Sequence, residues 1–207
     1  MESSALHTGL NTVLISGPTN HVGKTTVMRV LSAYWHRYRT AQTISSFEIP
    51  GMSALTLDEE PDLGHVWQAL CQQQQDHDLV LVEGEGGLGT PVTYDTTIAN
   101  LAWDWRLPTI LVVPAQWDAI APTIAAIALA RQSHLDLVGI VLNSPAPEPA
   151  SQADEIGSLL CNLTQVKLLG TVPFLTELNN EEHLCQVASD LLIENILGKL
   201  TMQKAYT

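Results

Sequence analysis

One segment near the start of the chain constrains its fold more than any other. A short, β-branched and apolar run at Thr12–Ser16 (TVLIS) leads into a glycine-containing turn, and a longer stretch, Lys24–Tyr38, follows the turn. Apolar side chains of that stretch, among them Val27, Leu31 and Tyr34, recur at the three- and four-residue spacing of one helical face. The segment therefore predicts a buried strand, a tight turn and an amphipathic helix, in that order.

The turn itself, Gly17-Pro-Thr-Asn-His-Val-Gly23-Lys24-Thr25, has the composition of a phosphate-binding loop. A glycine-rich turn between a strand and a helix directs backbone N–H groups and a helix N-terminus at an anion. Lys24 would reach the β- and γ-phosphate oxygens, and the Thr25 hydroxyl would bind Mg²⁺. The spacing is G-x5-G-K-T, because Pro18 stands where the strict motif has its first glycine. The alternative is a chance GKT in an ordinary loop, and the flanking strand and helix argue against it.

Strand-like and helix-like segments alternate along the rest of the chain. The later strand candidates are Gln42–Ile49, Leu79–Glu83, Thr109–Pro114, Leu137–Asn143 and Lys167–Val172. The later helix candidates are Gly64–Gln75, Thr96–Trp105, Ala119–Gln132, Gln152–Leu163 and Glu181–Leu197. Continuous apolar strands alternating with helices indicate a parallel sheet that is covered on both faces. We expect a three-layer α/β fold of the P-loop NTPase class, mostly parallel, in one nucleotide-binding domain over residues 1–207.

The segment Thr40–Leu63 fits this alternation poorly. It contains one weak strand candidate, Gln42–Ile49, followed by a Pro/Gly turn and an acidic run that includes Asp58 and Asp62. A doubly wound fold needs its second strand and a crossover here, and the segment is short for both. The sequence leaves open whether the sheet is one strand short.

Polar residues follow several strand candidates at their carboxyl ends. Glu83 ends the run LVLVE, at the edge of a parallel sheet where such folds bind ligands, and a carboxylate there can hold magnesium. An exposed acid before a flexible glycine turn is the alternative. Asn143 ends LVGIVLN, and Gly170–Leu175 ends the next strand. These residues could surround the base of a nucleotide, or they could simply form the turns that end the two strands.

The composition argues against several classes of partner. Twenty-two acidic residues against nine Lys and Arg give a net charge of −13, so there are few cations to bind nucleic acid or an anionic membrane. There is no run of apolar residues long enough to span a bilayer and no signal-peptide pattern, so we expect a cytoplasmic protein. Cys71, Cys161 and Cys185 are widely spaced in helix-like segments, and we expect three buried, free thiols.

Taken together, these motifs resemble the dethiobiotin synthetase family of the P-loop superfamily. The family's phosphate loop reads GTDTxxGKT, with the spacing found at Gly17–Thr25. Its later motifs VEGxGG, LPxxLVV, GxxxN and LLGxxP appear in the same order at Val82–Gly87, Leu107–Val113, Gly139–Asn143 and Leu168–Pro173. The resemblance runs from Asn11 to about Leu175, which is most of the chain.

The resemblance implies an activity and a set of site residues. The family closes a ureido ring on 7,8-diaminononanoate with CO₂, using ATP and Mg²⁺, as a homodimer in biotin synthesis. It implies that Lys24 is catalytic and that Thr25 and Glu83 bind magnesium. The implied nucleotide-binding residues are Gly17, His21, Val22, Gly23, Lys24, Thr25, Thr26, Glu83, Gly84, Glu85 and Gly86, with Asn143, Pro173, Phe174 and Leu175 at the adenine.

The chain departs from the family pattern on the substrate side. The family carries a second lysine in a KPxxSG-like segment on its second strand, whereas this chain has no lysine between Lys24 and Lys167. An aspartate of the same segment, which helps to bind magnesium in the family, is missing with it. Thr19 and His21 replace an aspartate and a second acidic residue of the loop, and Gln116–Asp118 replaces Lys-Leu-Gly at the head of a helix.

Three functions remain open from the sequence. The first is a dethiobiotin synthetase whose missing groups are replaced by others. The second is a catalytically impaired paralogue that binds nucleotide as a binding or regulatory protein. The third is a partitioning-type ATPase, which is the least favoured because it usually has a further lysine early in the loop and a basic or amphipathic surface, and neither is present. The first two are distinguished by measuring product formation beside nucleotide binding.

Overall fold

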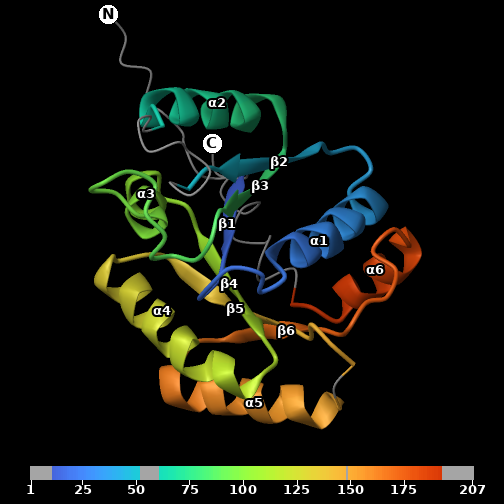
Figure 1. Ribbon diagram of the computed structural model, residues 1–207. Coiled ribbons are helices and arrows are strands. Elements are labelled where there is room, and N and C mark those ends of the chain that lie inside the picture. The colour runs from blue at the N-terminus through green and yellow to red at the C-terminus, as the bar shows by residue number, and fades with distance from the viewer. Residues whose placement is uncertain (1–10, 52–60, 148, 193–207) are drawn as a thin grey trace, which may run out of the picture.

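The computed structural model describes residues 11–51, 61–147 and 149–192, and these form one sheet with helices on both sides (Figure 1). The strands are β1 (Thr12–Ser16), β2 (Ile44–Ile49), β3 (Leu79–Gly84), β4 (Thr109–Pro114), β5 (Leu137–Asn143) and β6 (Leu168–Val172). All six are parallel, in the order β2-β3-β1-β4-β5-β6. The described residues thus confirm the α/β fold with a parallel sheet.

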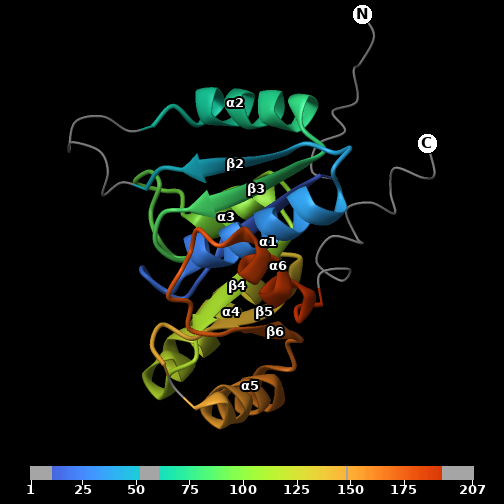
Figure 2. The same ribbon diagram turned by 90° about the vertical axis from the view of Figure 1, so that its right-hand side faces the viewer.

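The helices divide into two layers. They are α1 (Lys24–Tyr38), α2 (Leu63–Asp76), α3 (Ile98–Asp104), α4 (Ile120–Gln132), α5 (Ala150–Thr164) and α6 (Glu181–Ser189), with a short 3₁₀ turn at Trp117–Ala119 before α4. Figure 2 shows α1 and α6 side by side on one face of the sheet, and α3 and α4 behind it. Residues of α2, α3, α4 and α5 form one core cluster, and residues of α1 and α6 form the other.

The central strand shows why its sequence is continuously apolar. Val13 and Ile15 of β1 pack in the cluster beneath α1 and α6, whereas Leu14 packs on the opposite face. Alternate side chains of a strand point to opposite faces, so a strand that is covered on both faces needs apolar residues at every position. Each such side chain, when fully buried, contributes about 1.5–3 kcal/mol to the free energy of unfolding.

The open question about Thr40–Leu63 has a clear answer in the described part of that segment. Residues Ile44–Ile49 form β2, which pairs in parallel with β3 from Ile44 opposite Leu79 to Ile49 opposite Gly84. The sheet therefore has its second strand, which begins two residues later than expected. β2 is an edge strand, and of its residues only Ile49 is fully buried. Asp58 lies outside the described residues.

Two expectations need correction. All three cysteines are free, but only Cys185 is buried, whereas Cys71 and Cys161 are partly exposed because they lie at the margins of the buried faces of α2 and α5. The last helix was expected to reach Leu197; α6 ends at Ser189 with Asp190 as its C-cap, and residues from 193 onward lie outside the described range. No helix in the described ranges is long and apolar enough to cross a lipid bilayer.

Candidate nucleotide site

The loop between β1 and α1 has the backbone conformation that an anion-binding turn needs. His21 and Gly23 both have left-handed φ angles, of 58° and 94°, and Gly23 is the N-cap of α1. A side chain at Gly23 would place its Cβ 2.2 Å from Nδ2 of Asn143. That Nδ2 donates a hydrogen bond of 3.2 Å to the carbonyl oxygen of Val22. Asn143, which is only 5% exposed, thereby supports the loop from the end of β5.

Lys24 begins α1 and is only 6% exposed. Its Nζ donates a hydrogen bond of 2.8 Å to the carbonyl oxygen of Gly86. Burial lowers the pKa of the Lys24 ammonium, and the carboxylates of Glu83, Glu48 and Glu85 oppose this by favouring its charged form. The Lys24 amino group is therefore buried, is held by the Gly86 carbonyl, and has three carboxylates near it.

Thr25 and Glu83 are in direct contact. The Thr25 hydroxyl lies 3.2 Å from both carboxylate oxygens of Glu83, so its single proton is shared between two equivalent acceptors. The pKa of Glu83 is raised, mainly because the carboxyl group is partly buried, and the charge of Glu48 adds to this shift. The charge of Lys24 and the hydrogen bond from Thr25 act in the opposite direction and lower the pKa of Glu83. The two residues predicted to bind magnesium are thus adjacent.

The glycine-rich segment after β3 packs directly against the phosphate loop. A Cβ on Gly87 would come within 2.7 Å of the carbonyl oxygens of Gly17 and Pro18, and Leu88 N donates to the Gly17 oxygen at 3.2 Å. Gly86 has a left-handed φ of 75°, and its carbonyl accepts the hydrogen bond from Lys24 Nζ. The glycines at these positions allow two backbone segments to approach closely.

Most of the predicted site residues line one cavity of about 350 Å³. Its lining residues from the prediction are His21, Val22, Gly23, Lys24, Thr25, Thr26, Glu83, Glu85 and Gly86. Gly17 is the first residue of the loop, Gly84 ends β3 beside Ile98, and Asn143 holds the Val22 carbonyl. Pro173, Phe174 and Leu175 follow β6, whose residue Val172 is the register partner of Asn143. The adenine-binding role of Asn143 and Pro173–Leu175 stays a prediction.

Sequence reasoning missed two residues that line this cavity, Asn20 and Glu48. Glu48 lies on β2 directly opposite Glu83 on β3. Its signal was present in the sequence, since Glu48 is a charged residue near the carboxyl end of the weak strand candidate Gln42–Ile49. The uncertainty about that strand hid it.

Two charged residues that could be considered as replacements for the family's missing groups, Asp62 and Arg37, lie away from the phosphate loop. Asp62 caps α2, where its Oδ1 accepts hydrogen bonds of 2.9 Å from Gly64 N and 3.2 Å from His65 N. Arg37 lies thirteen residues after Lys24 along α1, about 20 Å away at the rise of an α-helix. Neither residue lines the cavity at the phosphate loop.

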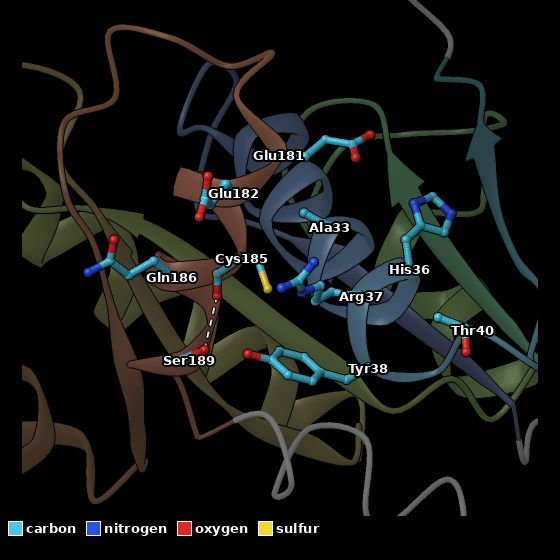
Figure 3. Close-up of a pocket in the computed structure, with 10 residues that line it drawn as sticks. All are labelled: Ala33, His36, Arg37, Tyr38, Thr40, Glu181, Glu182, Cys185, Gln186 and Ser189. Atoms are coloured by element: carbon cyan, nitrogen blue, oxygen red, sulfur yellow. Dashed lines mark hydrogen bonds between the residues drawn. The ribbon is translucent and has the colours of Figure 1, made fainter.

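A larger cavity, of about 900 Å³, lies between α1 and α6 (Figure 3). The end of α1 contributes His36, Arg37 and Tyr38, and α6 contributes Glu181 and Cys185 among others. No residue of the predicted nucleotide site lines it. The larger cavity therefore lies at the opposite end of α1 from the predicted nucleotide site.

The oxygen ligands at the smaller cavity fit a magnesium ion. Within the described residues, no three His, Cys, Asp or Glu side chains are grouped closely enough to hold a metal ion by themselves. Mg²⁺ needs no such cage, because proteins usually bind it through one or two carboxylates while phosphates and water complete the octahedron. Glu83 and Thr25 offer hard oxygen ligands beside the phosphate loop.

The fold and the loop define the class of protein: a P-loop nucleotide-binding protein with a parallel sheet. Solved structures with this arrangement include MinD, a cell division protein of Aquifex aeolicus, with a TM-score of 0.54 and 10% identity over 95% of this chain and 98% of that one. The MinC:MinD complex of the same organism matches equally, with 97% of its chain covered. At this identity the likeness concerns the fold alone.

Sequence comparison gives the family. The AAA domain family model matches residues 36–182. The ATP-dependent dethiobiotin synthetase of Gloeothece citriformis is 36% identical over 221 residues, covering 89% of this chain and 98% of the relative. That of Synechocystis is also 36% identical, covering 86% of this chain and 90% of the relative. The chain belongs to the ATP-dependent dethiobiotin synthetase family.

The alignment with the Gloeothece relative also bears on the missing segment. Its length of 221 exceeds the 207 residues of this chain, so the relative has residues without a counterpart here. Loss of the family's KPxxSG-like segment would produce a gap of this kind.

Proposed function

We propose that this protein is an ATP- and Mg²⁺-dependent ligase that closes the ureido ring of dethiobiotin on 7,8-diaminononanoate with CO₂. The observation that carries the proposal is the meeting of Lys24, Thr25 and Glu83 at one cavity, in a chain that belongs to the dethiobiotin synthetase family. The proposed reaction begins with a carbamate, formed from CO₂ and one amine. The carbamate attacks the γ-phosphate and ADP leaves; the second amine then displaces phosphate as the ring closes.

The chain's own groups prepare this site for a polyphosphate. On nucleotide binding, Lys24 would exchange the Gly86 carbonyl for β- and γ-phosphate oxygens, at little cost because its amino group already lies at the loop. The backbone N–H groups of the loop and the first turn of α1 would bind the remaining oxygens. Thr25 and Glu83 would hold magnesium, which supplies charge neutralisation at the phosphates.

The adenine would lie beyond this cavity, along the same edge of the sheet. Asn143 ends β5, and Pro173–Leu175 begins immediately after its register partner Val172. Phe174 is 40% exposed, which leaves an aromatic side chain accessible to a base. This arrangement supports the role that the resemblance implies for Asn143, Pro173, Phe174 and Leu175.

The second candidate function, an impaired nucleotide-binding paralogue, is favoured by one observation. Among the described residues that line the cavity, Lys24 is the only Lys or Arg, and it is accompanied by Glu48, Glu83 and Glu85. Loss of one cationic clamp from a phosphoryl-transfer site costs orders of magnitude in rate. We therefore expect slow turnover.

A homodimer is part of the proposal. The outer side of α4 carries exposed apolar residues, with Ile124 at 38% exposure and Trp117, in the turn before the helix, at 54%. Such a face on a small-molecule enzyme suits a second copy of the chain. Light scattering coupled to size-exclusion chromatography should give twice the monomer mass, and the monomer mass would overturn this part.

The proposed activity is tested by mass spectrometry of dethiobiotin formed from diaminononanoate, bicarbonate and Mg-ATP, beside calorimetric titration of Mg-ATP. We expect product and nucleotide binding with the wild-type protein and neither with Lys24→Ala. Nucleotide binding without any product would favour the paralogue. A wild-type protein that binds no nucleotide would refute both functions.

A further inference from the structure

We propose that Glu48 is a cation ligand of the nucleotide site, holding the divalent ion that accompanies ATP together with Glu83 and Thr25. The inference rests on the proposed function, in that it takes ATP to bind at the phosphate loop. It assigns a role to Glu48 on β2, a strand that lacks the family's second lysine and on which the sequence alone predicts no site residue.

The sheet geometry brings Glu48 and Glu83 together. The two residues are register partners on the parallel strands β2 and β3. Adjacent parallel strands lie about 4.8 Å apart, and register partners point to the same face of the sheet. Both side chains line the cavity that Thr25 also lines, and Thr25 already contacts both oxygens of Glu83. A cation at the Thr25 hydroxyl would thus have carboxylates from two neighbouring strands beside it.

The charge of Glu48 acts on the other ionisable groups of the cavity. Its charge supports the protonated form of Lys24 and contributes to the raised pKa of Glu83, so it is felt at both groups. Glu48, Glu83 and Glu85 together outnumber the single ammonium of Lys24. A polyphosphate entering without a cation would meet net negative charge, whereas a divalent ion between the carboxylates and the phosphates would turn that repulsion into attraction.

The ion's position would be completed by the nucleotide. No group of three His, Cys, Asp or Glu in the described ranges is arranged to hold a metal alone. Two carboxylates and a hydroxyl leave coordination places for phosphate oxygens and water, which is the usual arrangement for Mg²⁺. The nucleotide-free protein should therefore bind divalent ions weakly, and the nucleotide complex should bind them tightly.

Glu48 could bind the cation or could be an exposed acid that binds none, and the two roles predict opposite effects on nucleotide affinity in the presence of Mg²⁺. A cation ligand strengthens nucleotide binding when Mg²⁺ is present and weakens it when Mg²⁺ is absent. An exposed edge-strand acid that binds no cation repels the phosphates in both media. Removing its charge while keeping its shape separates the two.

The experiment compares the full-length wild-type protein with Glu48→Gln, using Glu155→Gln on the exposed face of α5 as the matched control. A non-hydrolysable ATP analogue is titrated by calorimetry in Mg²⁺ and in EDTA, and Mn²⁺ binding to the nucleotide complex is followed by electron paramagnetic resonance. For Glu48→Gln we expect about tenfold weaker analogue binding in Mg²⁺, tighter binding in EDTA, and about tenfold weaker Mn²⁺ binding. Glu155→Gln should match the wild type throughout.

Each other outcome has a definite meaning. Tighter analogue binding by Glu48→Gln in both media, or Mn²⁺ affinity equal to that of the wild type, would overturn the role of Glu48 and leave the proposed function standing. Failure of the wild-type protein to bind the analogue even in Mg²⁺ would overturn the proposed function, and the role of Glu48 with it. Circular dichroism melting of each variant shows that the comparison is made on folded protein.

Discussion

The loop at the start of α1 and the end of β2 contribute to the same cavity, yet they are built very differently. The loop is held by close contacts, with the Gly87 backbone against its carbonyls and the Asn143 side chain beneath Gly23. β2 is an edge strand that is paired on one side only and is mostly exposed or partly exposed. A segment held by close backbone packing tolerates little change, whereas an exposed edge strand tolerates much. We therefore expect the nucleotide half of the site to be retained, and we expect the substrate half, which the family builds from its second strand, to differ.

Among the variants that test this comparison, loss of Lys24 should have the largest effect on nucleotide binding. Lys24→Ala should lower Mg-ATP affinity at least a hundredfold and abolish product formation, because no other Lys or Arg among the described residues lines the cavity. Calorimetry measures the affinity, with Lys167→Ala on the exposed surface as the control. Equal affinity for the wild-type protein and Lys24→Ala would remove the basis of the site.

The rigidity of the loop is tested by Gly23→Ala. The left-handed φ of 94° and the contact at 2.2 Å with Asn143 should lower the free energy of unfolding by about 2–4 kcal/mol and weaken nucleotide binding. The control is Gly89→Ala, because Gly89 is exposed and a Cβ there meets only Leu129, at an ordinary 3.5 Å. Urea unfolding measures both variants, and an unaffected Gly23→Ala would show that the loop is less constrained than its packing suggests.

A smaller effect should follow from Asn143→Ala. The variant loses the hydrogen bond to the Val22 carbonyl, which should cost about 1–2 kcal/mol of stability and a few-fold in nucleotide affinity. Asn162→Ala, on the exposed side of α5, provides the control. If affinity falls and stability does not, Asn143 contacts the nucleotide and does not act through the loop.

The smallest expected effect on stability concerns the charge of Glu83. Because burial raises the pKa of Glu83, the folded protein binds its proton more tightly than the unfolded chain does. The ionised carboxylate therefore costs stability at neutral pH. That cost shrinks as the pH falls through the raised pKa and is gone only below the ordinary carboxyl pKa of the unfolded chain. Glu83→Gln should melt slightly higher than the wild type at neutral pH, with the difference vanishing in acid, while its Mg²⁺-dependent nucleotide affinity falls. A lower melting temperature for Glu83→Gln would contradict this sign.

Much of the fold was predictable because its signals are local. The strands Thr12–Ser16, Thr109–Pro114 and Leu137–Asn143 have the predicted bounds, since short apolar runs end at polar or turn residues on both sides. The helix Lys24–Tyr38 is also as predicted. The edge strand β2 was uncertain because an exposed strand lacks a continuous apolar run.

The candidate site residues that act through their side chains were predictable from the sequence, whereas the contacts that involve backbone carbonyls were less so. Lys24, Thr25 and Glu83 were found from a motif and from a strand end. The hydrogen bond from Lys24 to Gly86 and the support of Val22 by Asn143 depend on carbonyl positions that tertiary packing sets. Glu48 enters the cavity through the register of β2 with β3, which no local pattern reports.

The most direct test of an intact nucleotide half beside a weakened substrate half is the rate of dethiobiotin formation at saturating Mg-ATP, measured side by side with the Gloeothece citriformis relative. We predict product that depends on Mg-ATP and diaminononanoate, formed at least tenfold more slowly than by the relative, while the two proteins bind Mg-ATP with similar affinity. Equal rates would contradict the weakened substrate half. Absence of product despite nucleotide binding would contradict the ligase activity itself.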